Sequence, residues 1–239
     1  MIPETMAMHY RPGTPGRGED TARRILLAAI EVFADEGYEG ASTRSLASHA
    51  GVNAPAIQYY FGSKEGLYRA VIAHIAHLVE TRLEPLAQRI ETALGAQPTG
   101  GQPSQAELTA LLLDLLDGFL DLCVCRGIPE AAALLIARAE IENAAALDVL
   151  QQAVLRLAFG PAISLVARLL GLPNSDEEVK IRTFTIFGQA MVFKKRATKM
   201  CACPVLGWAE LDDPQIKIIA KILREQTEAI LRAATEKKS

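Results

Sequence analysis

The sequence is poor in aromatic residues, which make up 5% of its 239 positions, while hydrophobic residues of all kinds make up 50%. Because Ala and Leu are abundant and the strand-preferring aromatic residues are scarce, this composition favours helices over β-structure. The sequence also lacks an excess of positive charge: its formal net charge is -3, and its first 70 residues hold seven Lys and Arg against eight Asp and Glu. Attraction of a polyanion to the chain as a whole is therefore excluded.

Long uninterrupted apolar segments are missing too. The first 20 residues have no continuous apolar stretch of the kind that a secretory signal needs. The best candidate for a membrane segment, Leu108–Cys125, is interrupted at helical spacing by Asp114, Asp117 and Asp121, which predicts an amphipathic helix of a soluble protein. We therefore expect a cytoplasmic protein with no membrane partner. The aspartate row is expected to be solvated, although a cationic ligand could use it.

Recognisable catalytic motifs are absent from the sequence. It contains no G-x-S-x-G, no P-loop, no H-E-x-x-H and no G-x-G-x-x-G followed by a helix. Of the four histidines, His9 lies in the N-terminal segment and His49 in a predicted short helix, so no catalytic triad is suggested. The sequence predicts a protein that is not an enzyme and has no cofactor.

The four cysteines form two Cys-x-Cys pairs, which begin at Cys123 and Cys201. Side chains two positions apart on a helix point about 200° away from each other, so one pair cannot easily hold a single metal ion. We interpret these cysteines as small buried hydrophobes and predict no metal site. The alternative, a metal- or thiol-sensing site that the cysteines form with His74 or His77, stays open.

The N-terminal quarter of the chain shows a clear order of elements. Residues 1–18 are rich in Gly, Pro and Arg and predict a mobile arm. A first helix is expected from Glu19 to Glu36, because apolar residues recur at i, i+3, i+4 and i+7 from Leu26 to Phe33. Gly37 is expected to end this helix, since glycine readily adopts the positive φ that follows many helices.

Three further helix starts follow, each marked by a side chain that can cap a helix: Ser42, Asn53 and Ser63. Gly51 turns the chain between the two short helices, and Pro55 is tolerated in the first turn of the next one. The fourth helix continues with an apolar stripe from Leu67 to Leu78. A packed helix followed by two short helices around a glycine turn is a helix-turn-helix, which predicts a DNA-binding domain at residues 19–75.

The remainder, residues 76–239, is predicted to form a larger helical body. A loop is expected at Gly95–Ser104, and the following segments have the patterns of long helices. One of these is expected to open with a capping box of Ser175 and Glu178 and to run through Met200; the last is expected to begin at Asp213. No strand is predicted. The predicted fold class is all-α, with an N-terminal three-helix helix-turn-helix domain plus a larger helical domain.

The third helix has a surface suited to close approach to duplex DNA. With Ile57 pointing inward, Ala54 and Phe61 fall on the same side, while Pro55, Ala56, Gln58 and Tyr59 fall outward. The small residues at its start allow the helix to enter the major groove. We expect Gln58 to bond base edges and the hydroxyl groups of Tyr59 and Tyr60 to reach phosphates.

Residues Thr21–Ile75 resemble, in order and without a gap, the DNA-binding domain of the TetR family of repressors. The features that carry the resemblance are Phe33, Gly37-Tyr38, Leu46-Ala47, Ala50-Gly51-Val52, Tyr59-Tyr60-Phe61 and Ser63-Lys64-Glu65. Two departures stand out, because Gln58 replaces a frequent Tyr and Ala54-Pro55 replaces a common Lys-Gly pair. The base preference of the family is therefore not carried over.

The DNA contacts that we expect lie at helix starts and on the third helix. They are Ser42, Thr43, Arg44, Asn53, Ala54, Pro55, Gln58, Tyr59, Tyr60 and Lys64. The resemblance implies phosphate contacts for Arg44, Tyr59, Tyr60 and Lys64. Alternatively, Tyr60 belongs partly to the core, and Arg44 is an ordinary solvated residue of its helix.

The resemblance implies that the body, residues 76–239, binds a small molecule and dimerises, and the body is similar to the CecR-type subgroup. Candidate ligand contacts are polar groups among apolar helical residues: His74, Arg138, Glu140 and Gln189. Each has an ordinary alternative, a solvated position or a core histidine. We expect a mostly apolar cavity with few polar anchors.

A dimer surface is predicted from helices that are apolar on two sides. The last helix carries one apolar stripe from Ile216 to Ile230 and a second with Ile218 and Ile222. On the preceding helix, Gly188 has no side chain and so allows close approach of a second backbone. The predicted interface residues are Phe184, Gly188, Met191, Ile216, Ile219, Leu223 and Ile230. The alternative is one large core that uses both faces.

Together these features predict a ligand-responsive regulator of transcription. It is expected to repress, to bind a palindromic operator on double-stranded DNA as a homodimer, and to be released by a small amphipathic molecule. The alternative is a DNA-binding regulator that responds to metals or thiol oxidation through the Cys and His residues of the body.

Overall fold

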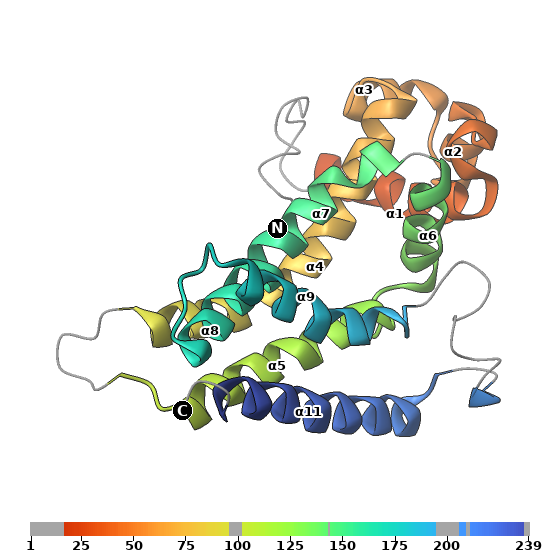
Figure 1. The fold of residues 1–239 in the computed structure, drawn as a ribbon. Coiled ribbons are helices and arrows are strands. Elements are labelled where there is room, and N and C mark those ends of the chain that lie inside the picture. The colour runs from red at the N-terminus through yellow and green to blue at the C-terminus, as the bar shows by residue number, and fades with distance from the viewer. Residues whose placement is uncertain (1–16, 96–101, 143, 195–205, 209–210, 237–239) are drawn as a thin grey trace. The chain divides into compact units, whose positions relative to one another are not determined.

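The computed structural model describes residues 17–95, 102–142, 144–194, 206–208 and 211–236. These residues form helices and turns and contain no strand, which confirms the all-α prediction. The α-helices are α1 (Arg17–Gly40), α2 (Thr43–His49), α3 (Ala54–Phe61), α4 (Lys64–Leu94), α5 (Gln105–Cys123), α6 (Glu130–Glu142), α7 (Asp148–Val154), α8 (Gly160–Leu170), α9 (Glu177–Met191) and α11 (Asp213–Glu236) (Figure 1). A 3₁₀ turn, η2 (Ala144–Leu147), precedes α7, and a π-helical turn, η3 (Leu155–Phe159), joins α7 to α8.

The chain folds as two compact units. Of the described residues, those within 17–78 and 128–152 form the first unit, and those within 79–127 and 153–236 form the second. Helix α4 runs from the first unit into the second, with the boundary between Leu78 and Val79. The division predicted from the sequence placed everything after residue 75 in the body, whereas the structure assigns α6 to the first unit, where it packs along α1.

The core of the first unit forms around the predicted stripe of α1. Leu26, Ala29, Ile30 and Phe33 are all buried, with at most 5% of each side chain exposed. The ring of Phe33 meets Tyr68 edge to face at 5.0 Å, and Tyr38 lies 4.9 Å from Tyr68. Gly37 has φ +75°, so the regular helix stops there as predicted.

The short helices begin at the predicted caps. Ser42 accepts a hydrogen bond from the backbone N–H of Ser45 at 2.9 Å, and the Ser45 hydroxyl oxygen accepts one from the Ser42 N–H at 3.1 Å. Asn53 accepts from the N–H of Ala56 at 3.2 Å, and Ser63 accepts from the N–H of Gly66 at 3.0 Å. These bonds satisfy N–H groups that a helix start leaves without intrahelical partners, so the helix-turn-helix is defined locally by the sequence.

The second unit is built by packing α5 against α8, α9 and α11. Phenylalanine rings fill its centre: Phe119 lies 5.1 Å from Phe187 and 5.7 Å from Phe159, and Phe159 stacks on Phe184 at 4.8 Å. Phe187 is fully buried, whereas 54% of Phe184 is exposed, so the cluster extends from the core to the surface.

Two predicted helix limits in this unit were wrong. The cap of α9 is Asp176, whose carboxylate accepts from the N–H of Glu178 at 2.8 Å, and not a capping box of Ser175 and Glu178. The helix ends at Met191 and not at Met200, because tight i to i+3 bonds from the N–H groups of Phe193 and Lys194 replace helical bonds. Residues 195–205 lie outside the described part of the chain.

Among the described residues, one helical run, 145–170, is long and apolar enough to cross a membrane, and an 18-residue window within it has a mean hydropathy of 1.7. However, 61% of that window is buried inside the protein. The burial gives the apolar residues a partner within their own chain, as in the core helix of a globular protein.

Candidate functional site

Helix α3 carries five of the ten predicted DNA-contacting residues, and four of these five are exposed. Ile57 is 1% exposed and turns inward as predicted, while Pro55, Gln58 and Tyr59 are exposed, Tyr59 at 51%. Ala54 was expected on the inward side, but it is exposed, because the packing of α3 begins only at the half-buried Ala56. The exposed surface therefore starts with small side chains and continues with an amide and a phenol, which suits entry into a groove.

The two tyrosines of α3 have different environments. Their rings meet at right angles with centroids 4.9 Å apart, and Tyr60 is half-buried where Tyr59 is exposed. Tyr60 is thus partly in the core, which is the alternative that the sequence left open, and its ring packs against the ring of Tyr59.

The start of α2 adds polar groups to the same unit. Ser42, Thr43 and Arg44 are all exposed, and Asn53 is exposed at the start of α3. No ion pair of Arg44 occurs among the described residues, so its guanidinium group is available to an anion. The capping oxygens of Ser42 and Asn53 are engaged by backbone N–H groups, whereas the Ser42 hydroxyl proton remains a donor.

Lys64 is held by the protein's own backbone. Its ammonium donates to the carbonyl of Tyr38 at 2.7 Å and to that of Ala41 at 2.9 Å, and it lies 4.4 Å from the centre of the Tyr38 ring. An ammonium group has three N–H donors, so at most one is left for an external acceptor such as a phosphate oxygen. The charge of Lys64 is therefore fixed in place on the turn between α1 and α2.

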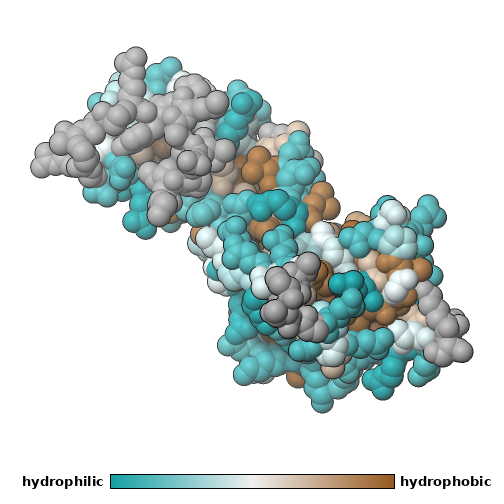
Figure 2. All heavy atoms as spheres, turned by 90° about the vertical axis from the view of Figure 1, so that its left-hand side faces the viewer, coloured by the Kyte–Doolittle hydropathy of each residue, from teal (hydrophilic) through white to brown (hydrophobic). Residues whose placement is uncertain are grey.

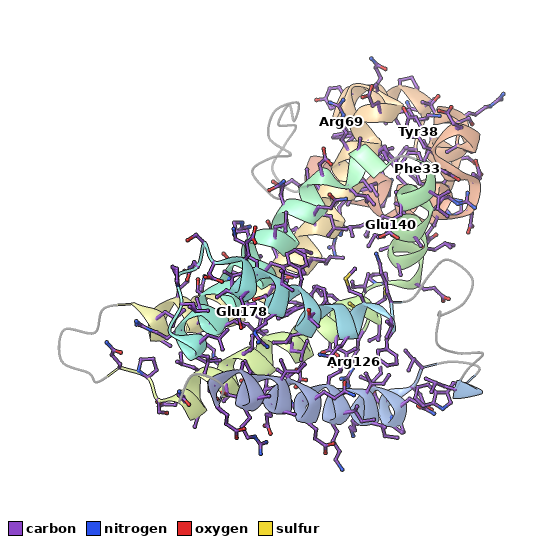
Figure 3. All side chains as sticks on the ribbon, viewed as in Figure 1. Phe33, Tyr38, Arg69, Arg126, Glu140 and Glu178 are labelled. Atoms are coloured by element: carbon purple, nitrogen blue, oxygen red, sulfur yellow. The ribbon has the colours of Figure 1, made fainter. Side chains whose placement is uncertain are left out.

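The four predicted ligand contacts are divided between the two units. His74, Arg138 and Glu140 belong to the first, and Gln189 belongs to the second. Burial, with smaller effects from His77 and Arg23, lowers the pKa of the half-buried His74 below its usual value. Glu140 is exposed on α6 (Figure 3). Nε2 of Gln189 is buried and has no hydrogen-bond partner among the described residues, so this group retains a donor for a ligand or a water molecule.

A groove of about 500 Å³ lies on the second unit between α5, α8 and α11. Its lining combines apolar and polar side chains: Gln105, Ala106, Thr109, Ala110, Leu113, Leu169, Arg224, Glu228, Leu231, Arg232 and Thr235. None of the predicted ligand contacts lines it. The sequence gives no signal for this groove, because it depends on how α5 and α11 pack and not on any local pattern.

The aspartate row of α5 is paired and not simply solvated. Arg224 of α11 donates to Asp117 at 2.5 Å and to Asp114 at 3.2 Å, and Arg89 of α4 also bonds Asp114 at 3.2 Å. Arg126 lies 3.5 Å from Asp121. The carboxylates are therefore neutralised by arginines of the same unit, which leaves little net negative charge to attract a cationic ligand.

The described cysteines are poorly suited to thiol sensing. Cys123 is buried, and burial raises the pKa of its thiol to about 12. Cys125 is half-buried, and the second pair, Cys201 and Cys203, lies outside the described residues. Within the described ranges, no group of three or more Cys, His, Asp or Glu side chains is placed to hold a metal ion.

We expect Cys123 to be almost inert toward thiol reagents. In a variant in which the other three cysteines are replaced by Ser, labelling by Ellman's reagent at pH 7.5 should be at least about 1000-fold slower than for an exposed thiol, because the thiolate is the reactive form. Unfolding in guanidinium chloride should restore full labelling. Rapid labelling of the folded protein would instead revive the thiol-sensing alternative.

Most of the predicted interface stripe on α11 is buried within its own unit. Ile216, Ile219 and Leu223 are 8%, 3% and 3% exposed, so they pack inside their own unit and cannot contribute area to a partner. Ile230 is half-buried. The stripe that remains exposed is the second one, with Ile218 at 53% and Ile222 at 44%.

Helix α9 presents a matching exposed stripe. Ile181, Phe184 and Met191 are 64%, 54% and 50% exposed, and the position of a side chain at Gly188 would have open space around it. These residues recur at i, i+3, i+7 and i+10 and so lie along one side of the helix, and α9 contacts α11. Hydrophobic surface is visible between hydrophilic side chains in the space-filling view (Figure 2).

Two family models match the chain. Residues 25–71 match the model described as bacterial regulatory proteins of the tetR family. Residues 108–234, more than half of the chain, match the C-terminal domain of the HTH-type transcriptional dual regulator CecR. The first match covers α2 and α3 with parts of α1 and α4, and the second covers most of the described second unit together with α6 and α7.

Curated proteins and solved structures agree with these matches. The HTH-type transcriptional dual regulator CecR of Shigella flexneri is 27% identical over 95% of this chain and 98% of its own length. A crystal structure of a TetR-family transcriptional regulator from Mesorhizobium loti superposes with a TM-score of 0.55 at 20% identity, over 90% of this chain and 98% of that one.

A structure of FadR from Bacillus subtilis in complex with stearoyl-CoA superposes with a TM-score of 0.51 at 14% identity, over 86% of this chain and 96% of that one. At this identity the likeness concerns the fold alone. The family models, the full-length relative and the shared fold lead to one conclusion: the chain belongs to the TetR family of bacterial transcriptional regulators, with a C-terminal domain of the CecR type.

Proposed function

We propose that this protein is a ligand-responsive transcriptional repressor that binds a palindromic operator as a homodimer. The observation that carries the proposal is the exposed face of α3. Pro55, Gln58 and Tyr59 are exposed on this face, while the fully buried Ile57 packs the opposite side of the helix into the core. A face of small, amide and phenol side chains has no role in the core of its own unit, whereas it fits the major groove.

The proposed contacts divide into two classes. Gln58 reads base edges, because an amide can both donate to and accept from a base. Arg44, Tyr59 and Lys64 hold phosphates, and Lys64 does so with the donor that its two backbone bonds leave over. Ser42 and Thr43, which are exposed at the start of α2, add hydroxyl groups to the same backbone contact.

The test is a selection of bound sequences from random duplexes, made with the parent protein and with two variants. Gln58→Ala should relax the preference at one base position in each half-site. Tyr59→Ala should weaken binding to all selected sequences alike, by about tenfold or more for each half-site. The two outcomes differ because one contact distinguishes bases and the other does not.

Gln88→Ala is a matched control, since Gln88 is an exposed glutamine on the part of α4 that belongs to the second unit. It should leave both affinity and preference unchanged. If Gln58→Ala and Tyr59→Ala bind like the parent, α3 does not supply the reading face.

The homodimer is proposed to form through the exposed stripes of α9 and α11. Phe184, Met191, Ile218 and Ile222 offer apolar area that their own unit leaves uncovered, and Gly188 permits close approach of a second backbone. Two helices from each subunit would make a four-helix interface around a twofold axis, which matches the symmetry of a palindromic operator.

The effector is proposed to be a small amphipathic molecule that binds the second unit. The groove between α5, α8 and α11 supports this by its mixture of apolar side chains with a few polar ones. Helix α4 belongs to both units, and Lys64 is its first residue. A ligand that favours one position of the C-terminal half of α4 would therefore change the position of Lys64 relative to DNA. Release from the operator then follows from a difference in ligand affinity between the two states.

A further inference from the structure

The last turn of α6 lies directly on the turn that ends α1. A Cβ atom at Gly37 would lie 3.0 Å from Nη1 of Arg138 and 3.1 Å from Oε2 of Glu142. The two side chains are themselves an ion pair, with Nε of Arg138 3.9 Å from Oε1 of Glu142. Gly37 is buried and has a positive φ, so its backbone can take this shape beneath the pair without a side chain in the way.

The turn below this ion pair is the one that holds Lys64. Gly37 is followed by Tyr38, whose carbonyl accepts from the Lys64 ammonium, and the turn closes at Ala41, whose carbonyl also accepts from it. Ala41 in turn donates its N–H to the carbonyl of Gly37 at 3.2 Å. The positions of both carbonyl acceptors therefore depend on the backbone at Gly37.

Glu142 also reaches the aromatic cluster beside this turn. Tyr68, which packs on Tyr38, has a raised pKa, first because it is buried and second because the Glu142 carboxylate is close to it. The carboxylate of Glu142 thus lies beside the place of a Cβ atom at Gly37 and close enough to Tyr68, which packs on Tyr38, to raise the pKa of Tyr68 (Figure 3 labels Tyr38 and Phe33 of this cluster).

We propose that Arg138 and Glu142 are positioning residues for DNA binding: they fix the Gly37–Ala41 turn, whose carbonyl groups aim the Lys64 ammonium at the operator backbone. This inference rests on the proposed function. It assigns to α6, which lies outside the helix-turn-helix and its contacts with DNA, a specific role in the affinity of the complex. This role within the first unit differs from the effector contact that the sequence predicted for Arg138.

A merely structural role predicts something different. The side chains of Arg138 and Glu142 are 31% and 47% exposed, and ion pairs as exposed as these contribute little to the stability of a fold. Their loss should leave the folded state intact, whereas an error of about 1 Å in the place of Lys64 is enough to break a phosphate contact. The effect is therefore expected in DNA binding and in its dependence on salt.

The experiment measures binding of the full-length protein to its selected operator at several salt concentrations. Arg138→Gln and Glu142→Gln should each weaken binding by about tenfold at low salt and reduce the slope of log affinity against log salt by about 1 to 2, since each dimer loses up to two phosphate contacts. Lys64→Met should give the same reduction in slope. The thermal unfolding midpoints should remain close to that of the parent.

A double-mutant cycle separates positioning from general damage. When Lys64→Met is already present, adding Arg138→Gln or Glu142→Gln should have almost no further effect on affinity, because both act through the same ammonium group. Glu130→Gln, an exposed position in the first turn of α6, and Arg168→Gln, exposed on α8, are the matched controls and should bind like the parent.

Three results would overturn the inference. They are full additivity with Lys64→Met, an unchanged salt slope in the Arg138 and Glu142 variants, or an equal loss of affinity in the two controls. Failure of the proposed function is distinguishable from these, because then the parent protein itself would select no duplex.

Discussion

Replacing Ile222 by Glu is expected to convert the proposed homodimer into a monomer and to abolish its binding to the operator. Ile222 is 44% exposed on its own chain, so a glutamate there is tolerated by the single subunit. In the proposed interface the substitution occurs twice, and each carboxylate would be buried without a partner at a cost of about 3 to 5 kcal/mol. Dimer affinity should fall by about 10,000-fold or more.

Sedimentation at micromolar concentration measures the first effect, and operator titration measures the second. Ile222→Leu is the control, because it keeps the apolar area and should remain dimeric. Circular dichroism should show the same helix content for parent and variant. A dimeric Ile222→Glu protein would exclude this face of α11 from the interface. Ile216, Ile219 and Leu223 on the other apolar face would not replace it, because they are buried within their own chain.

Phe187→Ala is expected to be the most destabilising single change in the second unit. Phe187 is fully buried and contacts the rings of Phe119 at 5.1 Å and Phe159 at 5.4 Å. Removing a phenyl ring from such a site loses its transfer free energy and leaves a cavity, which together cost about 3 to 5 kcal/mol. This is a large part of the roughly 5 to 15 kcal/mol that stabilises a typical domain.

Phe184→Ala provides the comparison, since Phe184 lies one turn away on α9 and stacks on the same Phe159 ring but is 54% exposed. Chemical unfolding followed at two protein concentrations distinguishes the pair. Phe187→Ala should lower stability at both concentrations, whereas Phe184→Ala should lower it chiefly at the higher concentration, where the dimer contributes. If both variants lost the same stability at both protein concentrations, Phe184 would belong to the core and not to the dimer interface.

The local features of the first unit were predictable from the sequence because they depend on neighbours in the chain. The caps Ser42, Asn53 and Ser63 each bond an N–H three residues away, so the spacing alone predicts them. The inward direction of Ile57 and the stop at Gly37 follow in the same way from helical geometry and from the freedom of glycine.

Features that depend on packing were not predictable. Helix α11 has two apolar faces, and no period in its sequence says that Ile219 faces its own unit while Ile218 faces outward. Arg138 was predicted as a ligand contact from its polar character among apolar residues. Its approach to Gly37, about a hundred positions away in the chain, has no signal in the sequence. The end of α9 at Met191 likewise depends on the turn that follows it.

The near absence of charge on the proposed reading surface has a consequence for how the regulator finds its target in a genome. Between Ser42 and Ser63 the single permanently charged side chain is Arg44. A protein slides along unrelated DNA when its Lys and Arg side chains bind the phosphates without regard to sequence. A protein with few such side chains on its DNA-facing surface stays bound only briefly at each encounter. Such a regulator would locate its operator mainly by repeated collisions from solution, so few copies would be bound elsewhere on the chromosome.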